Sequence, residues 1–192
     1  MRLFAIKLLA IKLIVGTTLL YFSAFANVVA ADPACHDLLD YKAAKLRSTE
    51  QVDFCQEFAG KAVLFVNTAS QCGFTPQFKG LEKLHKEYGD KLAVVGFPSN
   101  DFKQEYSDSA KVADVCYVNY GVTFTVLEPS IVKGDDANPI FKKLAERTGS
   151  SPEWNFNKYL VSADGESVQH FGSSVKPTSP GFKAQIDQVL GE

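Results

Sequence analysis

The chain has 192 residues, of which 46% are hydrophobic, and its 20 basic and 22 acidic side chains leave a formal net charge of −2. This length fits one domain with a short extension. The two kinds of charge are interspersed along the chain, whereas nucleic-acid-binding proteins concentrate basic residues on one surface, so the composition gives no support to a nucleic-acid partner.

Residues 1–31 are predicted to be a secretory signal peptide. An apolar run, residues 13–25, follows three basic side chains, Arg2, Lys7 and Lys12. Small residues come next, and we expect cleavage after Ala26 or after Ala31. An uncleaved membrane anchor is the alternative, but the run is short for a membrane span. We therefore expect an exported protein, periplasmic or secreted, with no stable membrane association after cleavage.

Residues 32–60 are expected to form an N-terminal extension with a hairpin. Two short segments, 41–46 and 51–54, flank a polar turn,. Cys35 and Cys55 lie near the two ends of this region. An even number of cysteines in an exported protein favours disulfides, so we expect these two to form a structural bridge. A redox sensor is the alternative for this pair.

The remaining residues, 61–192, are expected to form the core. A fully apolar strand at 62–66 leads into a tight turn that contains Cys72,. Thr75 and a proline then open a helix that ends at Tyr88, and a second strand follows at 92–97,. The two strands should be parallel, so the loop after the second strand leaves from the same sheet edge as Cys72.

Further elements follow at regular intervals. We expect a helix at 107–119 that contains Cys116, a strand at 124–127, a helix from Asn138 to Gly149, hairpin strands at 156–162 and 167–171, and a final helix after Ser179,. This order is that of an α/β protein with a thioredoxin-like fold, in which helices cover both faces of a mixed central sheet.

Cys72 is the candidate reactive group. It precedes a helix N-terminus, where the helix dipole and free N–H groups stabilise an anion such as the nucleophilic thiolate. A buried, inert turn cysteine is the alternative. Thr75 stands where a C-x-x-C pair would have its second cysteine, which argues against ordinary dithiol exchange. A lone thiolate can instead attack a peroxide to give a sulfenic acid. Cys116 could then condense with it if its helix end unwinds, because disulfide geometry is strict.

Three segments carry a family resemblance. The stretch 67–75, N-T-A-S-Q-C-G-F-T, resembles the nucleophile segment of the glutathione peroxidase family, with cysteine where some members have selenocysteine. G-F-P-S-N-D-F at 96–102, with Gln104-Glu105 after it, resembles the second family motif, and W-N-F-N-K-Y-L-V at 154–161 resembles the third. The resemblance runs from about residue 41 to the C-terminus. It implies peroxide reduction without a metal or an organic cofactor.

The resemblance also implies roles for single residues. In the family a glutamine, a tryptophan and an asparagine flank the nucleophile and hydrogen-bond to it. Trp154 and Asn155 match two of these, although Trp154 could instead be a core aromatic. Asp101 stands where we expect the glutamine, and its side chain should then point toward Cys72; the alternative is a residue that caps a turn. Cys116 matches the resolving cysteine of the thioredoxin-dependent members.

We therefore predict a cysteine-dependent thiol peroxidase. Cys72 would be oxidised by hydrogen peroxide or an organic hydroperoxide, Cys116 would resolve it, and a thioredoxin-like protein or glutathione would reduce the disulfide. Two alternatives stay open: a peroxide sensor that uses the same two cysteines, and a thiol–disulfide exchange enzyme. The three histidines do not have metal-ligand spacing,. The segment 148–153 is short, which favours a monomer, since long insertions there support tetramers in the family.

Overall fold

The structure is a computed structural model that describes residues 35–192. The predicted signal peptide and its two cleavage positions, Ala26 and Ala31, lie outside this range. Within residues 35–192, no helix has both the length and the apolar character that a membrane span requires.

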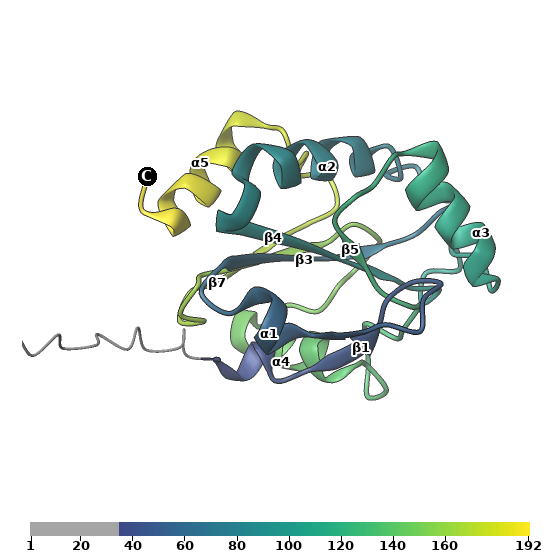
Figure 1. Ribbon diagram of the computed structural model, residues 1–192, viewed down its shortest axis with the longest axis horizontal. Coiled ribbons are helices and arrows are strands. Elements are labelled where there is room, and N and C mark those ends of the chain that lie inside the picture. The colour runs from purple at the N-terminus through teal and green to yellow at the C-terminus, as the bar shows by residue number, and fades with distance from the viewer. Residues whose placement is uncertain (1–34) are drawn as a thin grey trace, which may run out of the picture. The chain divides into compact units, whose positions relative to one another are not determined.

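A five-stranded mixed sheet forms the centre of the molecule (Figure 1). Its spatial order is β5-β4-β3-β6-β7. The strands are β3 (Ala62–Thr68), β4 (Leu92–Pro98), β5 (Thr125–Val126), β6 (Lys158–Val161) and β7 (Val168–Phe171). β3 pairs in parallel with β4, and β4 with β5, whereas β6 runs antiparallel to both β3 and β7. The predicted parallel unit and the thioredoxin-like α/β fold are confirmed.

Helices cover both faces of this sheet (Figure 1). On one face lie α2 (Gln77–Tyr88) and α5 (Pro180–Leu190), and on the other lies α4 (Pro139–Thr148) with the short α1 (Phe54–Phe58). Every residue of β3 is buried, so its side chains alternate between two apolar clusters. Leu64 packs toward α2 and α5, and Phe65 packs toward α1 and α4. A strand buried on both faces has no polar side and therefore reads as one apolar run.

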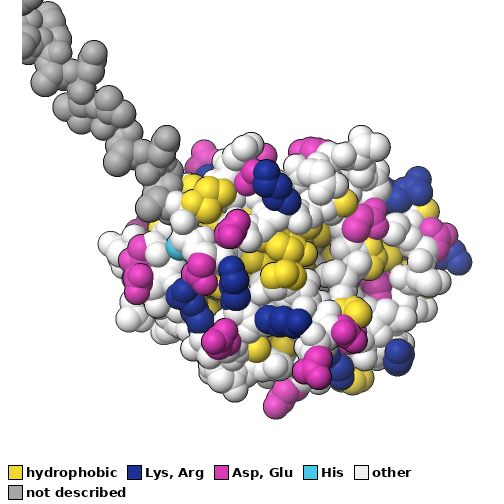
Figure 2. Space-filling view, turned by 90° about the horizontal axis from the view of Figure 1, so that it is seen from below, with side chains coloured by type: hydrophobic (Ala, Val, Ile, Leu, Met, Phe, Trp, Pro, Cys, Tyr) yellow, Lys and Arg dark blue, Asp and Glu magenta, His cyan; other side chains and the backbone are white. Residues whose placement is uncertain are grey.

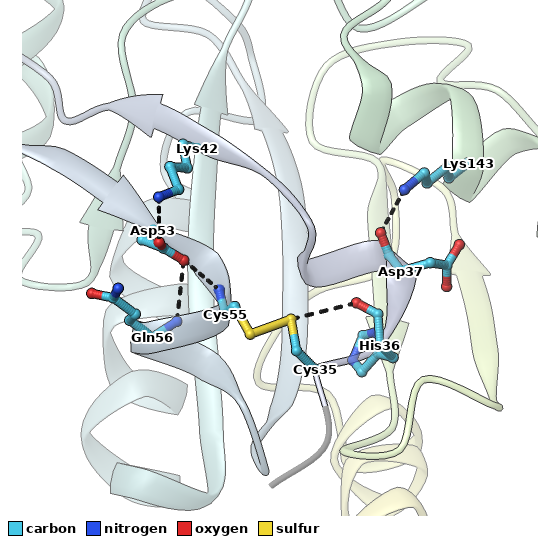
Figure 3. The surroundings of a disulfide bond; sticks show 8 residues. All are labelled: Cys35, His36, Asp37, Lys42, Asp53, Cys55, Gln56 and Lys143. Atoms are coloured by element: carbon cyan, nitrogen blue, oxygen red, sulfur yellow. Dashed lines mark hydrogen bonds and ion pairs between the residues drawn. A yellow bond between two sulfur atoms is a disulfide. The ribbon is translucent and has the colours of Figure 1, made fainter. Parts of the chain in front are cut away.

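The N-terminal region forms the expected hairpin. A 3-10 turn (η1, Asp37–Leu39) precedes β1 (Lys42–Ala44) and β2 (Gln51–Asp53), which pair antiparallel. The sequence did not predict the helix α1 that follows. Its first turn is capped by Asp53, which accepts hydrogen bonds from the backbone N–H groups of Cys55 and Gln56 (Figure 3).

The predicted bridge between Cys35 and Cys55 is confirmed. The two sulfurs are bonded, with Cα atoms 5.5 Å apart, and the bridge joins the first described residue to α1 (Figure 3). On the face shown in Figure 2, basic and acidic side chains are interspersed, as the sequence indicated.

Two predicted elements are corrected. The single helix expected at 107–119 is a short α-helix, α3 (Ser109–Ala113), followed by a π-helical segment, η3 (Asp114–Asn119). The strand expected from 156 begins only at Lys158, because Phe156 has a left-handed backbone with φ of 62°,. A short 3-10 turn, η2 (Gly89–Lys91), links α2 to β4.

Candidate active site

Cys72 lies in the tight connection between β3 and α2. Its Sγ accepts a hydrogen bond from the backbone N–H of Phe74 at 3.4 Å. Its own backbone N–H bonds to the Thr75 hydroxyl oxygen at 3.1 Å, and that hydroxyl lies 2.7 Å from the Cys72 carbonyl oxygen. Thr75 therefore fixes the cysteine turn. The prediction that Thr75 caps the helix is corrected, because the N-cap of α2 is Pro76 and no side chain caps it.

The loop after β4 reaches this turn from the neighbouring strand. The backbone N–H of Gln71 donates to the Gln104 carbonyl oxygen at 2.9 Å. The N–H of Ser70 donates to the carboxylate of Glu105 at 3.1 Å. Glu105 is buried, and this burial raises the pKa of its carboxyl group. Both partners leave the carboxyl ends of adjacent parallel strands, which is why the two loops meet,.

A third segment, the turn before β6, completes the arrangement. The side-chain amide of Asn155 is fully buried and donates to Oε1 of Gln104 at 3.0 Å. Asn67, at the end of β3, fixes this turn by donating to the Trp154 carbonyl oxygen at 3.0 Å and accepting from the N–H of Asn157 at 2.9 Å. The three sequence motifs therefore come together around one sheet edge, the first two after β3 and β4, as expected, and the third in the turn before β6.

The sequence comparisons decide the family. Residues 38–145 match the family model described as glutathione peroxidase. The chain belongs to the glutathione peroxidase family. It is accordingly a thiol peroxidase, an oxidoreductase that acts on peroxides.

Several family members are similar to this peroxidase. A glutathione peroxidase-like peroxiredoxin of Chlamydomonas reinhardtii is 45% identical over 141 residues, covering 70% of this chain and 86% of that protein. A hydroperoxy fatty acid reductase of Synechocystis is 41% identical over 150 residues, covering 70% of this chain and 86% of that protein. The crystal structure of Trgpx in apo form superposes with a TM-score of 0.64 at 32% identity, covering 82% of this chain and 98% of that one.

Asp101 does not occupy the place we expected in this peroxidase. One of its carboxylate oxygens accepts a hydrogen bond from the backbone N–H of Val132 at 2.7 Å. No hydrogen bond joins it to Cys72 in the described part of the chain. Asp101 thus joins its own loop to the segment that contains Val132. The glutamine that lies with Asn155 is Gln104, which sequence reasoning missed although it follows in the same motif.

Trp154 lies at the surface and is not a core aromatic. The residue is 41% exposed, and its ring packs against Phe102 with centroids 5.4 Å apart. The ammonium of Lys133 lies over the other ring of this pair, 4.5 Å from the Phe102 centroid. Between residues 35 and 192, no hydrogen bond joins Trp154 or Asn155 to the Cys72 sulfur, so their role toward the thiolate stays a prediction.

Cys116 is the second free cysteine. It lies in η3 with 1% of its surface exposed, in the same apolar cluster as Cys72. Burial, aided by the charge of Glu105, raises the pKa of the Cys116 thiol to about 12. Because the thiolate is the reactive form, burial in this position disfavours reaction of Cys116,. A π-helical segment is an uncommon feature that is frequent at functional sites. Within residues 35–192 no cluster of three or more His, Cys, Asp or Glu could hold a metal ion.

Proposed function

We propose that Cys72 is the peroxidatic residue of this thiol peroxidase. Its thiolate attacks one oxygen of a hydroperoxide and the O–O bond breaks. The sulfur is oxidised by two electrons to a sulfenic acid, and the second oxygen takes up a proton and leaves as an alcohol or water. The observation that carries this assignment is the position of Cys72, in a turn where the N–H of Phe74 points at its sulfur and the Gln104 loop and Asn155 turn converge.

We further propose that Cys116 resolves the sulfenic acid. Its thiolate attacks the Cys72 sulfur, the S–O bond breaks, and a disulfide and water form. The chain has four cysteines, and Cys35 and Cys55 are bonded to each other, which leaves Cys116 as the available thiol. Opening of η3 would both bring Cys116 to Cys72 and release it from the burial that raises its pKa.

A thioredoxin-like protein is the proposed reductant. Its two thiols would transfer two electrons to the Cys72–Cys116 disulfide and restore both free cysteines. Glutathione alone fits a lone oxidised cysteine better than an internal disulfide. The name of the Chlamydomonas relative supports the preference for a thioredoxin-like protein over glutathione, since that relative is described as a peroxiredoxin.

Export is also part of the proposal. Residues 1–31 have the layout of a signal peptide, and disulfides such as Cys35–Cys55 persist in oxidising compartments,. We propose that the mature chain begins after Ala26 or Ala31 and acts as a monomer, because segment 148–153 is short.

A peroxide-consumption assay tests this function. The mature chain is supplied with hydrogen peroxide and either glutathione or thioredoxin with its reductase. We expect many turnovers with thioredoxin, none with Cys72→Ser, and loss of thioredoxin-dependent turnover with Cys116→Ser while Cys72 is still oxidised once. Oxidation of the wild-type protein by a single equivalent without turnover would instead indicate a sensor. Wild-type turnover by Cys116→Ser would show that another group resolves Cys72.

A further inference from the structure

The turn that brings Asn155 to Gln104 has a strained backbone at its next residue, Phe156. This residue is fully buried and has a left-handed φ of 62°. A bulky residue rarely adopts this conformation, because its Cβ crowds the following carbonyl oxygen. Strained residues persist only where their surroundings hold them, and they gather at active sites. The groups that hold Phe156 therefore also determine where Asn155 lies.

The conformation of Phe156 is set by the orientations of the peptide groups on its two sides. The preceding group is held by the N–H of Phe156, which donates to the Asn67 carbonyl oxygen at 2.6 Å. The following group is held at both ends. Its N–H, which belongs to Asn157, donates to Oδ1 of Asn67 at 2.9 Å, and its carbonyl oxygen accepts from the ammonium of Lys158 at 2.7 Å. No other hydrogen bond reaches this carbonyl oxygen within residues 35–192.

Lys158 occupies a place that is unfavourable for its charge. It is the first residue of β6 and is fully buried. No ion pair joins its ammonium to an acidic side chain in the part of the chain that the structure describes. Burial without a counter-ion disfavours the charged form and lowers the pKa of Lys158,. An apolar side chain of the same length would avoid this penalty, but it could not make the hydrogen bond to Phe156.

The same turn connects to the loop beside Cys72 through one side chain, Asn155. Its amide nitrogen bonds to Oε1 of Gln104, and the Gln104 carbonyl oxygen bonds to the N–H of Gln71. The other polar atom of Asn155, Oδ1, is buried and has no hydrogen-bond partner between residues 35 and 192. The bond to Gln104 is therefore what locates this side chain. A rotation of the peptide group after Phe156 would displace Asn155 from Gln104.

We propose that Lys158 is a positioning residue for the oxidation of Cys72. Its ammonium holds the Phe156 carbonyl oxygen, which keeps the turn in its left-handed form and presents the Asn155 amide to Gln104. Lys158 acts through this turn and not on the peroxide itself. Without its hydrogen bond, the turn relaxes toward an ordinary backbone conformation and the loop beside Cys72 loses a fixed contact. This inference rests on the proposed role of Cys72 and adds a positioning residue to it.

The test measures the rate constant of Cys72 oxidation by hydrogen peroxide in Lys158→Met. Methionine has a similar length but no N–H group, so we expect a loss of about 10-fold, because small displacements of positioning groups slow a reaction. Lys158→Gln, whose N–H donor lies on a side chain shorter by one atom, should lose less. Two controls should react at the wild-type rate. Lys142→Met removes an exposed charge, and Ile140→Val shortens a side chain in the apolar cluster that does not contain Cys72.

Spectroscopy of the turn provides a second readout. Trp154 is the one tryptophan of the chain, and its carbonyl oxygen accepts from the Asn157 side chain in the same turn, so its fluorescence reports on this segment. Lys158→Met should shift the emission of Trp154, whereas both controls should give the wild-type spectrum. In NMR spectra, the side-chain amide hydrogens of Asn155 should exchange faster with water in Lys158→Met, because the bond to Gln104 opens more often.

A wild-type rate constant for Lys158→Met would overturn the proposal. So would an equal loss in Lys158→Gln and Lys158→Met, an equal loss in Ile140→Val, or a slow Lys158→Met protein in which Trp154 and Asn155 give wild-type signals. If Lys158→Met does not fold, Lys158→Gln is compared with the wild-type protein by the same rate and spectra.

Failure of this proposal is distinct from failure of the proposed function. In each of these cases, oxidation of the wild-type protein by hydrogen peroxide would leave the peroxidatic role of Cys72 intact. A wild-type protein that does not react with hydrogen peroxide would contradict that role itself, and the signals of Trp154 and Asn155 would still show whether Lys158 holds the turn.

Discussion

The buried side-chain amide of Asn155 donates a hydrogen bond to Oε1 of Gln104 at 3.0 Å, across 51 residues of sequence. The Gln104 carbonyl oxygen accepts a second bond from Gln71, the neighbour of Cys72. Gln104 therefore connects the turn before β6 to the cysteine turn. Asp101, three positions earlier, bonds to Val132 instead.

This relationship predicts that one of two substitutions in the same loop slows Cys72 oxidation and that the other leaves it unchanged. Gln104→Leu should slow Cys72 oxidation on the order of 10- to 100-fold, because it leaves the Asn155 amide unpaired and disturbs the loop that bonds to Gln71, the neighbour of Cys72,. Asp101→Asn keeps an acceptor oxygen for Val132 and should oxidise at the wild-type rate. Stopped-flow measurement of the rate of Cys72 oxidation by hydrogen peroxide tests both predictions against the wild-type protein.

The pH dependence of Asp101 variants extends this test. Asp101→Gln and the wild-type protein should give superimposable rates of Cys72 oxidation against pH, because the carboxylate is held by a different loop. A pH profile altered by Asp101→Gln, together with a normal rate for Gln104→Leu, would return Asp101 to the site.

Cys116 should be far less reactive than Cys72 in the reduced, folded protein. Its thiol is buried and its pKa is raised to about 12, so at neutral pH very little of it is ionised,. Iodoacetamide at pH 7 should therefore modify Cys72 first. Low urea concentrations that open η3 without global unfolding should accelerate the modification of Cys116 selectively. Equal rates for both thiols without urea would show that η3 does not protect Cys116.

Lys158 should make stability depend on pH. It is fully buried in β6, where its ammonium donates to the Phe156 carbonyl oxygen at 2.7 Å, and burial lowers its pKa to about 7. In the unfolded chain the pKa of a lysine is about 10.4, so between about pH 7 and pH 10 the unfolded state binds more protons. The free energy of unfolding should then rise with pH by up to about 1.4 kcal/mol per unit, and below pH 7 this contribution is constant.

Urea unfolding of Lys158→Met measures this effect. From pH 7 to pH 9 the free energy of unfolding of the wild-type protein should rise by about 2 kcal/mol relative to the variant. Lys142→Met, an exposed change on α4, serves as the control and should follow the wild-type protein. Parallel curves for Lys158→Met and the wild-type protein would show that Lys158 stays charged in the folded state at both pH values.

The Cys35–Cys55 bridge should contribute to stability and not to catalysis. It closes a loop across a sequence separation of 20 residues, which corresponds to about 3 kcal/mol of restricted unfolded-chain entropy,. Replacing both cysteines by alanine should lower the free energy of unfolding by that order and leave the rate of Cys72 oxidation unchanged. A loss of activity without a loss of stability would instead favour the redox-sensor reading of this pair.

The sequence predicted the elements whose signals are local. The apolar run of β3 and the Asn138 cap of α4, which accepts from the N–H of Phe141, needed no tertiary information. The π-helical segment was missed because its buried positions fit an ordinary helical pattern as well. The short helix α1 was missed because five residues give too little periodicity.

The sequence predicted the location of the site, but it assigned Asp101 the place beside Asn155 that Gln104 occupies. Spacing after β4 placed the loop at the right edge, yet it could not show which side chain turns inward. Lys103 has a left-handed backbone with φ of 60°, and its N–H bonds to the Asn100 carbonyl oxygen, so the chain reverses there. That reversal follows Asp101 and precedes Gln104, which explains why the two side chains have different partners.

A disulfide map after a single oxidation tests most directly whether Cys116 resolves oxidised Cys72. The protein, with Cys72 and Cys116 reduced, is treated with one equivalent of hydrogen peroxide. The remaining thiols are then alkylated, and peptides are identified by mass spectrometry without reduction. We expect a new Cys72–Cys116 disulfide beside an intact Cys35–Cys55 bridge. Oxidised Cys72 with Cys116 fully alkylated, or a Cys72 bond to any other cysteine, would contradict this expectation.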